Sequence, residues 1–216
     1  MSVGAARVRF ALATRNLGKI REVTAIYGHL EIGWVSLMDL PQIGEVAEEG
    51  ATYAENAAAK ARTVSSASGL TALADDSGLE IDALGGSPGV HSARFLGPAA
   101  TDAERNIRIL QLLQELPDPK RTARYVAAVA LAHPDGTVHV FEGICEGWIA
   151  TRPSGAGGFG YDPIFVPRGE TRTMAEVPAE VKNRISHRAR ALRAAEPHLV
   201  EILNMPGKDR PAGSAK

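Results

Sequence analysis

Cysteine is nearly absent from this chain of 216 residues, which contains only Cys145. A lone cysteine cannot form an internal disulfide, and such low cysteine usage is typical of a protein kept in a reducing compartment. We therefore expect a cytoplasmic location. Cys145 has no obvious partner nearby in the sequence that would activate it as a nucleophile, which favours an ordinary strand position.

Long hydrophobic runs and an excess of one charge are also missing. The first ten residues lack the apolar run of a signal peptide, and no later stretch is long enough to span a membrane. The formal net charge is −1, so no general attraction to nucleic acid or to an anionic membrane is expected. If the protein binds a polyanion, a local cationic patch must do so.

The remaining composition, with 44% apolar and 23% charged residues, is that of an ordinary globular protein. Strand-like and helix-like segments alternate at first and strands gather later, which predicts an α/β fold with a mixed sheet flanked by helices. The length allows one large domain or two closely joined lobes. We assign residues 1–205 to a single two-lobed domain and residues 206–216 to a flexible tail.

Polar residues at favourable positions predict the starts of four helices. Asn16 caps a helix that follows the first strand, and Thr52 and Thr101 each begin a capping box. Ser186 caps the last helical region. We expect Pro197 to interrupt that region, because proline lacks the N–H that a helix interior requires.

Two adjacent carboxylates, Asp75 and Asp76, follow the apolar stretch 70–74, which we expect to be a buried strand ending at a turn at Ser77 and Gly78. Two like charges beside a core strand repel each other and resist desolvation. A cation would remove that penalty, and ligands with oxygen only favour a hard ion such as Mg²⁺. For an isolated Asp pair, a solvated strand end is the ordinary explanation.

The acidic loop 44–50 offers a further carboxylate. Glu48 or Glu49 from this loop could complete a metal site with Asp76. A solvated run of charges is the simpler explanation of the loop taken alone.

The cap at Asn16 places Lys19 in the first turn of its helix, where a cation opposes the helix dipole. The conflict disappears if an anion binds at this helix start, where free N–H groups and Lys19 would both face it. The pattern therefore suggests a phosphate site, with an ordinary exposed lysine as the alternative. The glycine spacing of a Walker P-loop is absent.

The run 155–160 formally fits the G-x-G-x-x-G pattern of dinucleotide-binding proteins. That pattern must begin a helix, and here Pro163 follows within a few residues, so we reject dinucleotide binding. We favour a flexible loop that delivers Phe159 and Tyr161 to a flat ligand. An ordinary connection with aromatic core residues is the alternative.

Lys182, His187 and Arg188 form a basic cluster at the helix that Ser186 caps. This second cationic helix start repeats the pattern around Lys19. A solvated basic face is the simpler explanation, and RNA binding is a minor option. Acidic ligands, two cationic helix starts and a glycine–aromatic loop are together the parts of a site for a Mg²⁺-bound nucleoside triphosphate.

Six stretches of the sequence resemble, in order, the motifs of the inosine triphosphate pyrophosphatase family, which hydrolyses non-standard purine nucleoside triphosphates. They extend over nearly the whole chain, and six motifs in order are far more specific than any one of them. The stretches are residues 14–19, 53–61, 74–79, 85–94, 157–165 and 182–188.

The resemblance implies a two-lobed fold around a long mixed sheet, usually a homodimer, with the site in a central cleft between the lobes. It implies Mg²⁺-dependent conversion of ITP, dITP and XTP to the monophosphate and pyrophosphate, which cleanses the nucleotide pool. Glu48 and Asp76 would hold Mg²⁺, and Asp76, Lys19 and Lys60 would carry catalysis. The residues implied to bind substrate are Thr14, Arg15, Asn16, Lys19, Lys60, Ser77, Phe159, Gly160, Tyr161, Asp162, Lys182, His187 and Arg188.

Three positions depart from the commoner family pattern. Arg15 stands where Gly is frequent and adds a charge near the phosphates, and Tyr53 replaces Phe. The acidic loop has Glu48 and Glu49 before Gly50 where Glu-Thr-Gly is common, so either glutamate is a candidate for the metal.

We expect a water to attack the α-phosphorus while pyrophosphate leaves, with Asp76 either deprotonating that water or ligating the metal. Donors from Arg188 or His187 to O6 would favour hypoxanthine and xanthine over adenine. Two alternatives stay open, a Maf-like pyrophosphatase for pyrimidine or modified nucleotides, and a nucleotide-sensing or RNA-binding module without turnover. A pure binder of polyanions gains nothing from the carboxylates Asp75 and Asp76, which argues against the second.

Overall fold

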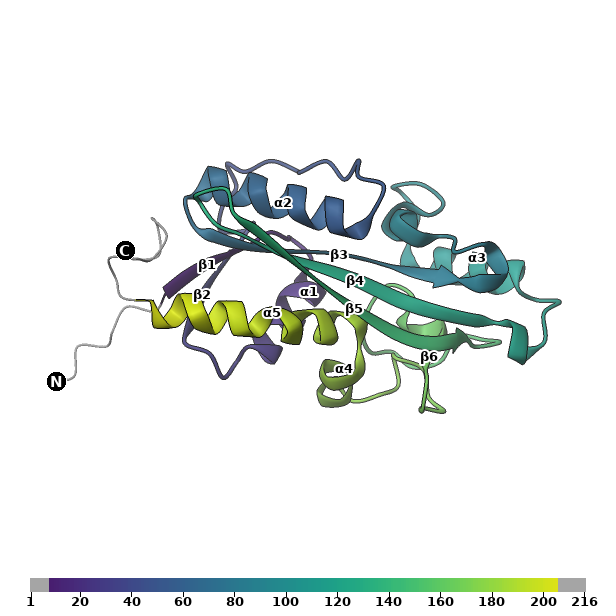
Figure 1. Cartoon of the computed structure of the whole chain (residues 1–216). Coiled ribbons are helices and arrows are strands. Elements are labelled where there is room, and N and C mark those ends of the chain that lie inside the picture. The colour runs from purple at the N-terminus through teal and green to yellow at the C-terminus, as the bar shows by residue number, and fades with distance from the viewer. Residues whose placement is uncertain (1–7, 206–216) are drawn as a thin grey trace. The chain divides into compact units, whose positions relative to one another are not determined.

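A six-stranded mixed sheet with flanking helices forms the framework of the protein (Figure 1). The computed structural model describes residues 8–205, and the predicted tail at 206–216 lies outside the described residues. The strands follow the order β2-β1-β3-β4-β5-β6 across the sheet. The observed architecture confirms the predicted α/β class.

The chain alternates between strands and helices up to β3, and strands then follow more closely. The strands are β1 (Val8–Leu12), β2 (Ile32–Ser36), β3 (Thr71–Ile81), β4 (Thr122–Ala132), β5 (Val138–Ile149) and β6 (Phe165–Pro167). The helices are α1 (Leu17–Ile26), α2 (Tyr53–Ser68), α3 (Asp102–Leu112), α4 (Ala179–Ile185) and α5 (His187–Asn204), with 3₁₀ turns η1 (Asp82–Leu84), η2 (Gly89–Arg94), η3 (Asp118–Lys120) and η4 (Asp162–Ile164).

The chain divides into two compact units. Within the described residues, the first unit contains 8–76, 128–142 and 191–205, and the second contains 77–127 and 143–190. The three long strands β3, β4 and β5 each contribute one end to each unit.

The first unit is built on parallel strands. β1 pairs in parallel with both β2 and β3, with Phe10 opposite Trp34 on one side and Thr71 on the other. The phenyl ring of Phe10 is fully buried and lies 5.8 Å from the ring of Trp34, measured between centroids. Helix α2 packs against β1. Its alanines Ala57 and Ala61 have no exposed surface, and their small size permits this close approach.

The second unit has a separate apolar core, in which Leu79 of β3, Ile109 of α3 and Phe165 of β6 are fully buried. β6 pairs antiparallel with β5. A side chain on Gly147 would lie 2.2 Å from the carbonyl oxygen of Val166, so only glycine permits this pairing. Two parallel pairs in the first unit and an antiparallel pair in the second make the sheet mixed.

The capping predictions are confirmed. Asn16 accepts hydrogen bonds from the first turn of α1, and both Thr52 and Thr101 form complete capping boxes with the glutamate three residues later. The hydroxyl of Ser186 accepts the N–H of Ala189 at the start of α5. The cap positions are readable from sequence because each depends on side chains within one helical turn.

Two expectations for the secondary structure are wrong. β3 does not end at a turn after residue 74 but continues to Ile81, because the buried residues Leu79 and Ile81 extend its apolar face. The aspartate pair therefore lies in the middle of a strand. Helix α5 also continues through Pro197, whose ring is exposed. Leu192 precedes the proline in the helix and Leu199 follows it, and both side chains are fully buried. Burial on both sides of the proline compensates the missing hydrogen bond.

None of the helices between residues 8 and 205 combines the length and the apolar character needed to cross a membrane.

Candidate functional site

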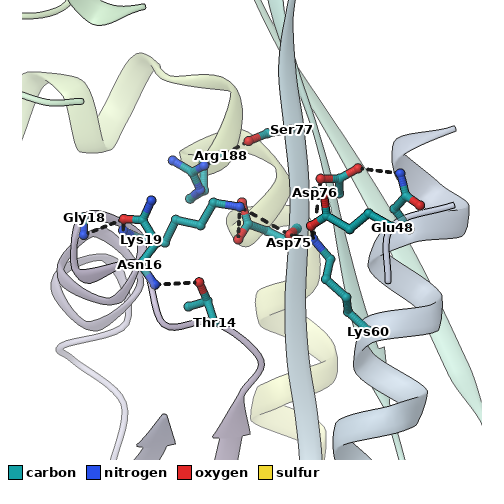
Figure 2. A network of polar contacts seen from close by, with 11 residues as sticks. Thr14, Asn16, Gly18, Lys19, Glu48, Lys60, Asp75, Asp76, Ser77 and Arg188 are labelled. Carbon is teal, nitrogen blue, oxygen red and sulfur yellow. Dashed lines mark hydrogen bonds and ion pairs between the residues drawn. The ribbon is translucent and has the colours of Figure 1, made fainter. Parts of the chain in front are cut away.

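Charged side chains gather in the first unit around the middle of β3 (Figure 2). Asp75 and Asp76 are 4% and 6% exposed. Burying adjacent carboxylates is costly unless cations accompany them. Lys19 from α1 and Lys60 from α2 supply these cations. We call the set Lys19, Glu48, Asn56, Lys60, Asp75 and Asp76 the charged cluster.

Lys60 has three oxygen partners in this cluster. Its Nζ lies 2.8 Å from Oε1 of Glu48, 2.8 Å from the carbonyl oxygen of Asp75 and 3.4 Å from Oδ1 of Asp76. Burial lowers the pKa of Lys60, but the charges of Asp76, Asp75 and Glu48 outweigh burial and raise it above 10.5. Lys60 is therefore an ammonium ion at neutral pH.

Lys19 occupies the position that the cap at Asn16 predicts. Oδ1 of Asn16 accepts the N–H groups of Gly18 and Lys19 at 2.8 and 3.2 Å, and the N–H of Asn16 donates to the hydroxyl of Thr14 at 3.1 Å. Nζ of Lys19 lies 3.1 Å from Oδ1 of Asp75. Lys19 thus has a carboxylate partner within the chain, a contact that the sequence argument for a bound anion did not include.

Asp76 is held by the amide of Asn56 as well as by the ammonium group of Lys60. Nδ2 of Asn56 donates to Oδ2 of Asp76 at 3.0 Å, and Oδ1 of Asn56 accepts the N–H of Gly50 at 2.8 Å. Burial raises the pKa of Asp76 above 3.8, and Glu48 adds to this, although Lys60, Asn56 and Lys19 oppose it. The result is a carboxylate that takes up a proton more readily than a free aspartate.

The role of Asn56 in this cluster was not predicted from the sequence. Its signal in the sequence is weak: asparagine is a poor residue inside a helix, and this one stands in the first turns of α2. Its side chain is 1% exposed and connects the end of the acidic loop with β3. A buried asparagine with both ends of its amide engaged is a positioning element rather than a helix former.

The carboxylates of the charged cluster meet the requirements of a metal ion only in part. Among residues 8–205, no three or more His, Cys, Asp or Glu side chains are arranged to hold a metal by themselves. Glu48 and Asp76 nevertheless both reach the ammonium group of Lys60, so two carboxylates already surround one positive charge. Mg²⁺ is commonly held by one or two carboxylates together with substrate phosphates and water. The residues present fit such a shared ion and do not form a closed protein cage.

Of the two candidate glutamates in the acidic loop, Glu48 contacts Lys60 of this cluster, whereas the side chain of Glu49 is exposed. Arg15, which departs from the family pattern, donates from Nη2 to the carbonyl oxygen of Ile43 at 2.6 Å. It therefore ties the turn before α1 to the start of the acidic loop.

A second group of polar and aromatic side chains lies within the second unit. The ring of Phe159 has Nζ of Lys182 at 4.7 Å and Cζ of Arg188 at 5.4 Å from its centroid. Cations over an aromatic face at these distances are attracted to it. Nη2 of Arg188 also donates to the hydroxyl of Ser77 at 3.0 Å (Figure 2). We call Phe159, Asp162, Lys182, His187 and Arg188 the aromatic–cation cluster.

Asp162 organises this second cluster. One of its carboxylate oxygens accepts from Lys182 and, at 2.9 Å, from the N–H of Phe159. The hydroxyl of Tyr125 lies 3.4 Å from the other oxygen. Gly158 has a φ of +72°, and a Cβ there would lie 2.0 Å from Asp162, so the loop requires glycine at this point. The ring of His187 stacks on Tyr125 at a centroid distance of 4.4 Å.

Tyr161 does not accompany Phe159. It is 5% exposed, belongs to the apolar core of the second unit and donates its hydroxyl to the carbonyl oxygen of Ser92 at 2.8 Å. The expectation that the loop delivers this ring to a ligand is therefore wrong for Tyr161, because the ring is needed in the core. The rejection of dinucleotide binding is consistent with the structure, since η4 and β6 come directly after the loop in place of a long helix.

Comparison with known proteins identifies the chain. Its sequence matches the Ham1 family over residues 10–198. The chain belongs to the Ham1 family. Two similar curated proteins are each named a dITP/XTP pyrophosphatase. One, from Geobacter sulfurreducens, is 47% identical over 88% of this chain and 96% of its own. The other, from Streptomyces coelicolor, is 48% identical over 90% of this chain and 98% of its own.

A solved structure agrees with this assignment. The HAM1 protein from Coxiella burnetii superimposes with a TM-score of 0.81 at 40% identity, covering 90% of this chain and 99% of that one. The family resemblance inferred from six motifs is thus confirmed. In this Ham1 protein five of the six motifs contribute residues to the charged cluster of the first unit or to the aromatic–cation cluster of the second, and the stretch 85–94 contributes to neither.

Proposed function

We propose that this Ham1 protein is a nucleoside triphosphate pyrophosphohydrolase that converts ITP, dITP and XTP to the monophosphate and pyrophosphate. The observation that carries the proposal is the charged cluster, in which buried carboxylates and lysines converge on the middle of β3. The curated relatives named dITP/XTP pyrophosphatase support the substrate class. Removal of such nucleotides would cleanse the nucleotide pool.

The triphosphate binds at the charged cluster in this proposal. Lys19 and Lys60 supply positive charge, and Thr14 and Asn16 form the polar turn that precedes α1. Arg15 stabilises that turn through the carbonyl of Ile43. The cluster alone holds three carboxylates, Glu48, Asp75 and Asp76, against these two lysines. A bound Mg²⁺ would make the cluster net positive, and an arriving triphosphate would then offset that charge.

Glu48 and Asp76 would hold Mg²⁺ in this scheme. When bound, this ion would supply positive charge to the phosphate oxygens and to the leaving pyrophosphate. Mg²⁺ is preferred over softer ions because the donors are carboxylate oxygens. Glu49 is not assigned to the metal, because its side chain is exposed.

The reaction is an attack of water on the α-phosphorus. The water oxygen forms a new bond to phosphorus while the bond from the α-phosphorus to the bridging oxygen breaks. Asp76 either accepts the proton of the water or holds the metal that orients this water, and without a metal burial raises its pKa and favours proton uptake. Lys19 and Lys60 neutralise the negative charge that develops on the departing pyrophosphate.

The base binds at the aromatic–cation cluster in the same proposal. The ring of Phe159 offers a stacking surface, and Arg188 and His187 offer donors to O6 of hypoxanthine or xanthine. Adenine presents an amino group at that position, so donor would face donor and hydrogen bonds would be lost. Lys182 and Asp162 fix the ring, and Gly160, Ser77 and the main chain at Tyr161 contribute to its surroundings.

We further propose that the protein is a homodimer in the cytoplasm, organised as one two-lobed domain. The chain has a single cysteine and therefore cannot form an internal disulfide, which supports the cytoplasmic location. Light scattering of the purified protein tests the oligomeric state. A mass of one chain at micromolar concentration would contradict the dimer.

Hydrolysis of ITP in ¹⁸O-labelled water tests the proposed function. We expect pyrophosphate release that depends on Mg²⁺, stops with a chelator, and places the label in the monophosphate. Label in the pyrophosphate would contradict attack at the α-phosphorus. Release of single phosphates would contradict the reaction class.

A further inference from the structure

Helix α3 holds the tip of the loop that carries Phe159. The N–H of Gly160 donates to Oδ2 of Asp102 at 2.8 Å, and the carbonyl of Gly160 accepts from Nδ2 of Asn106 at 3.0 Å. Both main-chain polar groups of one loop residue are thus engaged by side chains four positions apart on the same helix. We call this pair of hydrogen bonds the α3 clamp.

Helix α3, which carries both clamp residues, is itself fixed in position. The capping box of Thr101 and Glu104 fixes the start of α3, and Ile109 on the same helix is fully buried. Oδ1 of Asp102 accepts from Arg105 at 3.1 Å, and Arg105 donates in turn to the carbonyl of Phe95. The carboxylate that receives the Gly160 N–H is therefore restrained from its other side.

Packing does not hold the loop on this side. A cavity of about 360 Å³ is lined by α3 through Asp102, Asn106 and Ile107, and by the loop residues 155–160. This pocket is partly open to solvent and is not filled by side chains of the core. Because the space is open here, hydrogen bonds to α3 must fix the loop tip where contacts between side chains do not.

Asn106 has a feature that structural stability does not explain. Its side chain is 4% exposed, and Oδ1 is buried without a hydrogen-bond partner among the described residues. A buried carbonyl without a hydrogen-bond partner costs free energy. The other end of the same amide, Nδ2, donates to the carbonyl oxygen of Gly160.

We propose that Asp102 and Asn106 are positioning residues for purine binding: by clamping Gly160 they hold the Phe159 ring in the orientation that stacks on the base. This role rests on the proposed function of the aromatic–cation cluster. Gly160 is left-handed, with a φ of +63°, and is the next residue after Phe159, so a change in its peptide groups rotates the Phe159 main chain. Asp162 fixes the peptide group before Phe159, and the α3 clamp fixes the peptide group after it.

The clamp is tested with four variants of the full chain. Asp102→Ala removes one acceptor, and Asn106→Asp removes the donor while keeping the size of the side chain. Asp102→Asn keeps an oxygen acceptor and serves as the conservative rescue. Gln111→Ala changes an exposed residue of the same helix and is the matched control.

We expect Asp102→Ala and Asn106→Asp to raise KM for ITP about tenfold, with kcat within about twofold of the wild type. Inhibition by inorganic tripolyphosphate, which has no base, should stay unchanged. Asp102→Asn should recover most of the loss. A fall in kcat at unchanged KM, or equal loss of tripolyphosphate binding, would overturn the proposal.

Amide hydrogen exchange separates this inference from the proposed function. Peptides covering residues 154–162 should exchange faster in Asn106→Asp and Asp102→Ala than in the wild type or Gln111→Ala. Unchanged exchange would overturn the clamp whether or not ITP is a substrate. If exchange rises but the wild type hydrolyses no purine triphosphate, the proposed function fails, and with it the base-stacking role, while the clamp itself stands.

Discussion

The charged cluster and the aromatic–cation cluster are built in opposite ways. In the charged cluster, side chains from two helices, a strand and the acidic loop meet, and the contacts are mostly between full charges. In the aromatic–cation cluster, a glycine-rich loop is held through its main chain, and one ring faces two cations. Charge set on rigid elements suits the chemistry of a phosphate chain, whereas a ring on a held loop suits selection of a base.

This difference predicts a division of kinetic effects. Changes in the charged cluster should act on kcat, because its groups stabilise charge that develops during the reaction. Changes in the aromatic–cation cluster should act on KM and on the choice between bases. A variant of the charged cluster that changes only KM, or a variant of the aromatic–cation cluster that changes only kcat, would contradict this division.

The largest effect is expected for Asp76→Asn. The substitution keeps the size of the side chain but removes the carboxylate that serves as base or as metal ligand, so kcat for ITP should fall by about 10²–10⁴-fold. Circular dichroism should show an unchanged fold. Asp118→Asn, at an exposed position, is the control. Turnover near that of the wild type would refute the assignment of Asp76.

Lys60→Met should lower kcat by about 100-fold. Because Lys60 lowers the pKa of Asp76, its loss should raise that pKa further. Activity requires the ionised form of Asp76, so the acidic limb of the pH profile, which should lie above pH 3.8 in the wild type, should move to higher pH. Lys120→Met is an exposed control. An unmoved acidic limb would show that Lys60 and Asp76 are not coupled.

Phe159→Ala should raise KM for ITP about 5- to 100-fold, the range expected when a base loses an aromatic stacking partner. kcat should change little, and discrimination against ATP should weaken. Phe141→Ala, in the other unit, serves as the control for loss of a ring. A large loss in kcat with constant KM would contradict the claim that the aromatic–cation cluster acts on KM.

Histidines away from both clusters should affect only stability. Burial lowers the pKa of His133 below 6.5, with His139 and His198 adding to this and Asp135 opposing it. The unfolded chain therefore binds the proton more readily, so stability falls as pH drops below 6.5 through the pKa of the folded state. His133→Gln should reduce the drop in Tm between pH 7.5 and 5.5 by about 2 °C, as thermal melts can show, and kcat should not change. An identical drop in the variant would contradict this.

The smallest effect concerns Cys145, which is 2% exposed and whose pKa burial raises to about 11. At pH 8 the thiol is neutral, so a disulfide reagent should label the native protein at least about 100 times more slowly than the unfolded protein. Blocking the few thiols that do react should leave hydrolysis of ITP unchanged. Rapid labelling of the native protein would show that this part of the second unit opens.

The sequence predicted the parts of this structure that depend on short-range signals. The caps at Asn16, Thr52, Thr101 and Ser186 were predictable because each contacts its own helix within one turn. The six motifs placed the family because their order extends over the chain. The fold class was predictable from the alternation of strands and helices.

Features that depend on distant partners were not predictable. A strand was expected to end before Asp75 and Asp76, because aspartate is rare inside strands. The strand continues because Lys19 and Lys60, 56 and 15 residues from Asp75, reach its backbone and accompany the carboxylates into the interior. Asn56 and Asn106 were missed for the same reason, since only their long-range contacts reveal their roles.

Competition between ITP and ATP in one reaction with Mg²⁺ tests the central proposal most directly. Measured as the ratio of kcat/KM values, the preference for ITP should be at least about 100-fold, because adenine would leave donors of the base site unpaired. Phe159→Ala should reduce this ratio, and Lys60→Met should leave it nearly unchanged. Equal hydrolysis of ITP and ATP by the wild type would contradict both the proposed substrate class and the assignment of base selection to the aromatic–cation cluster.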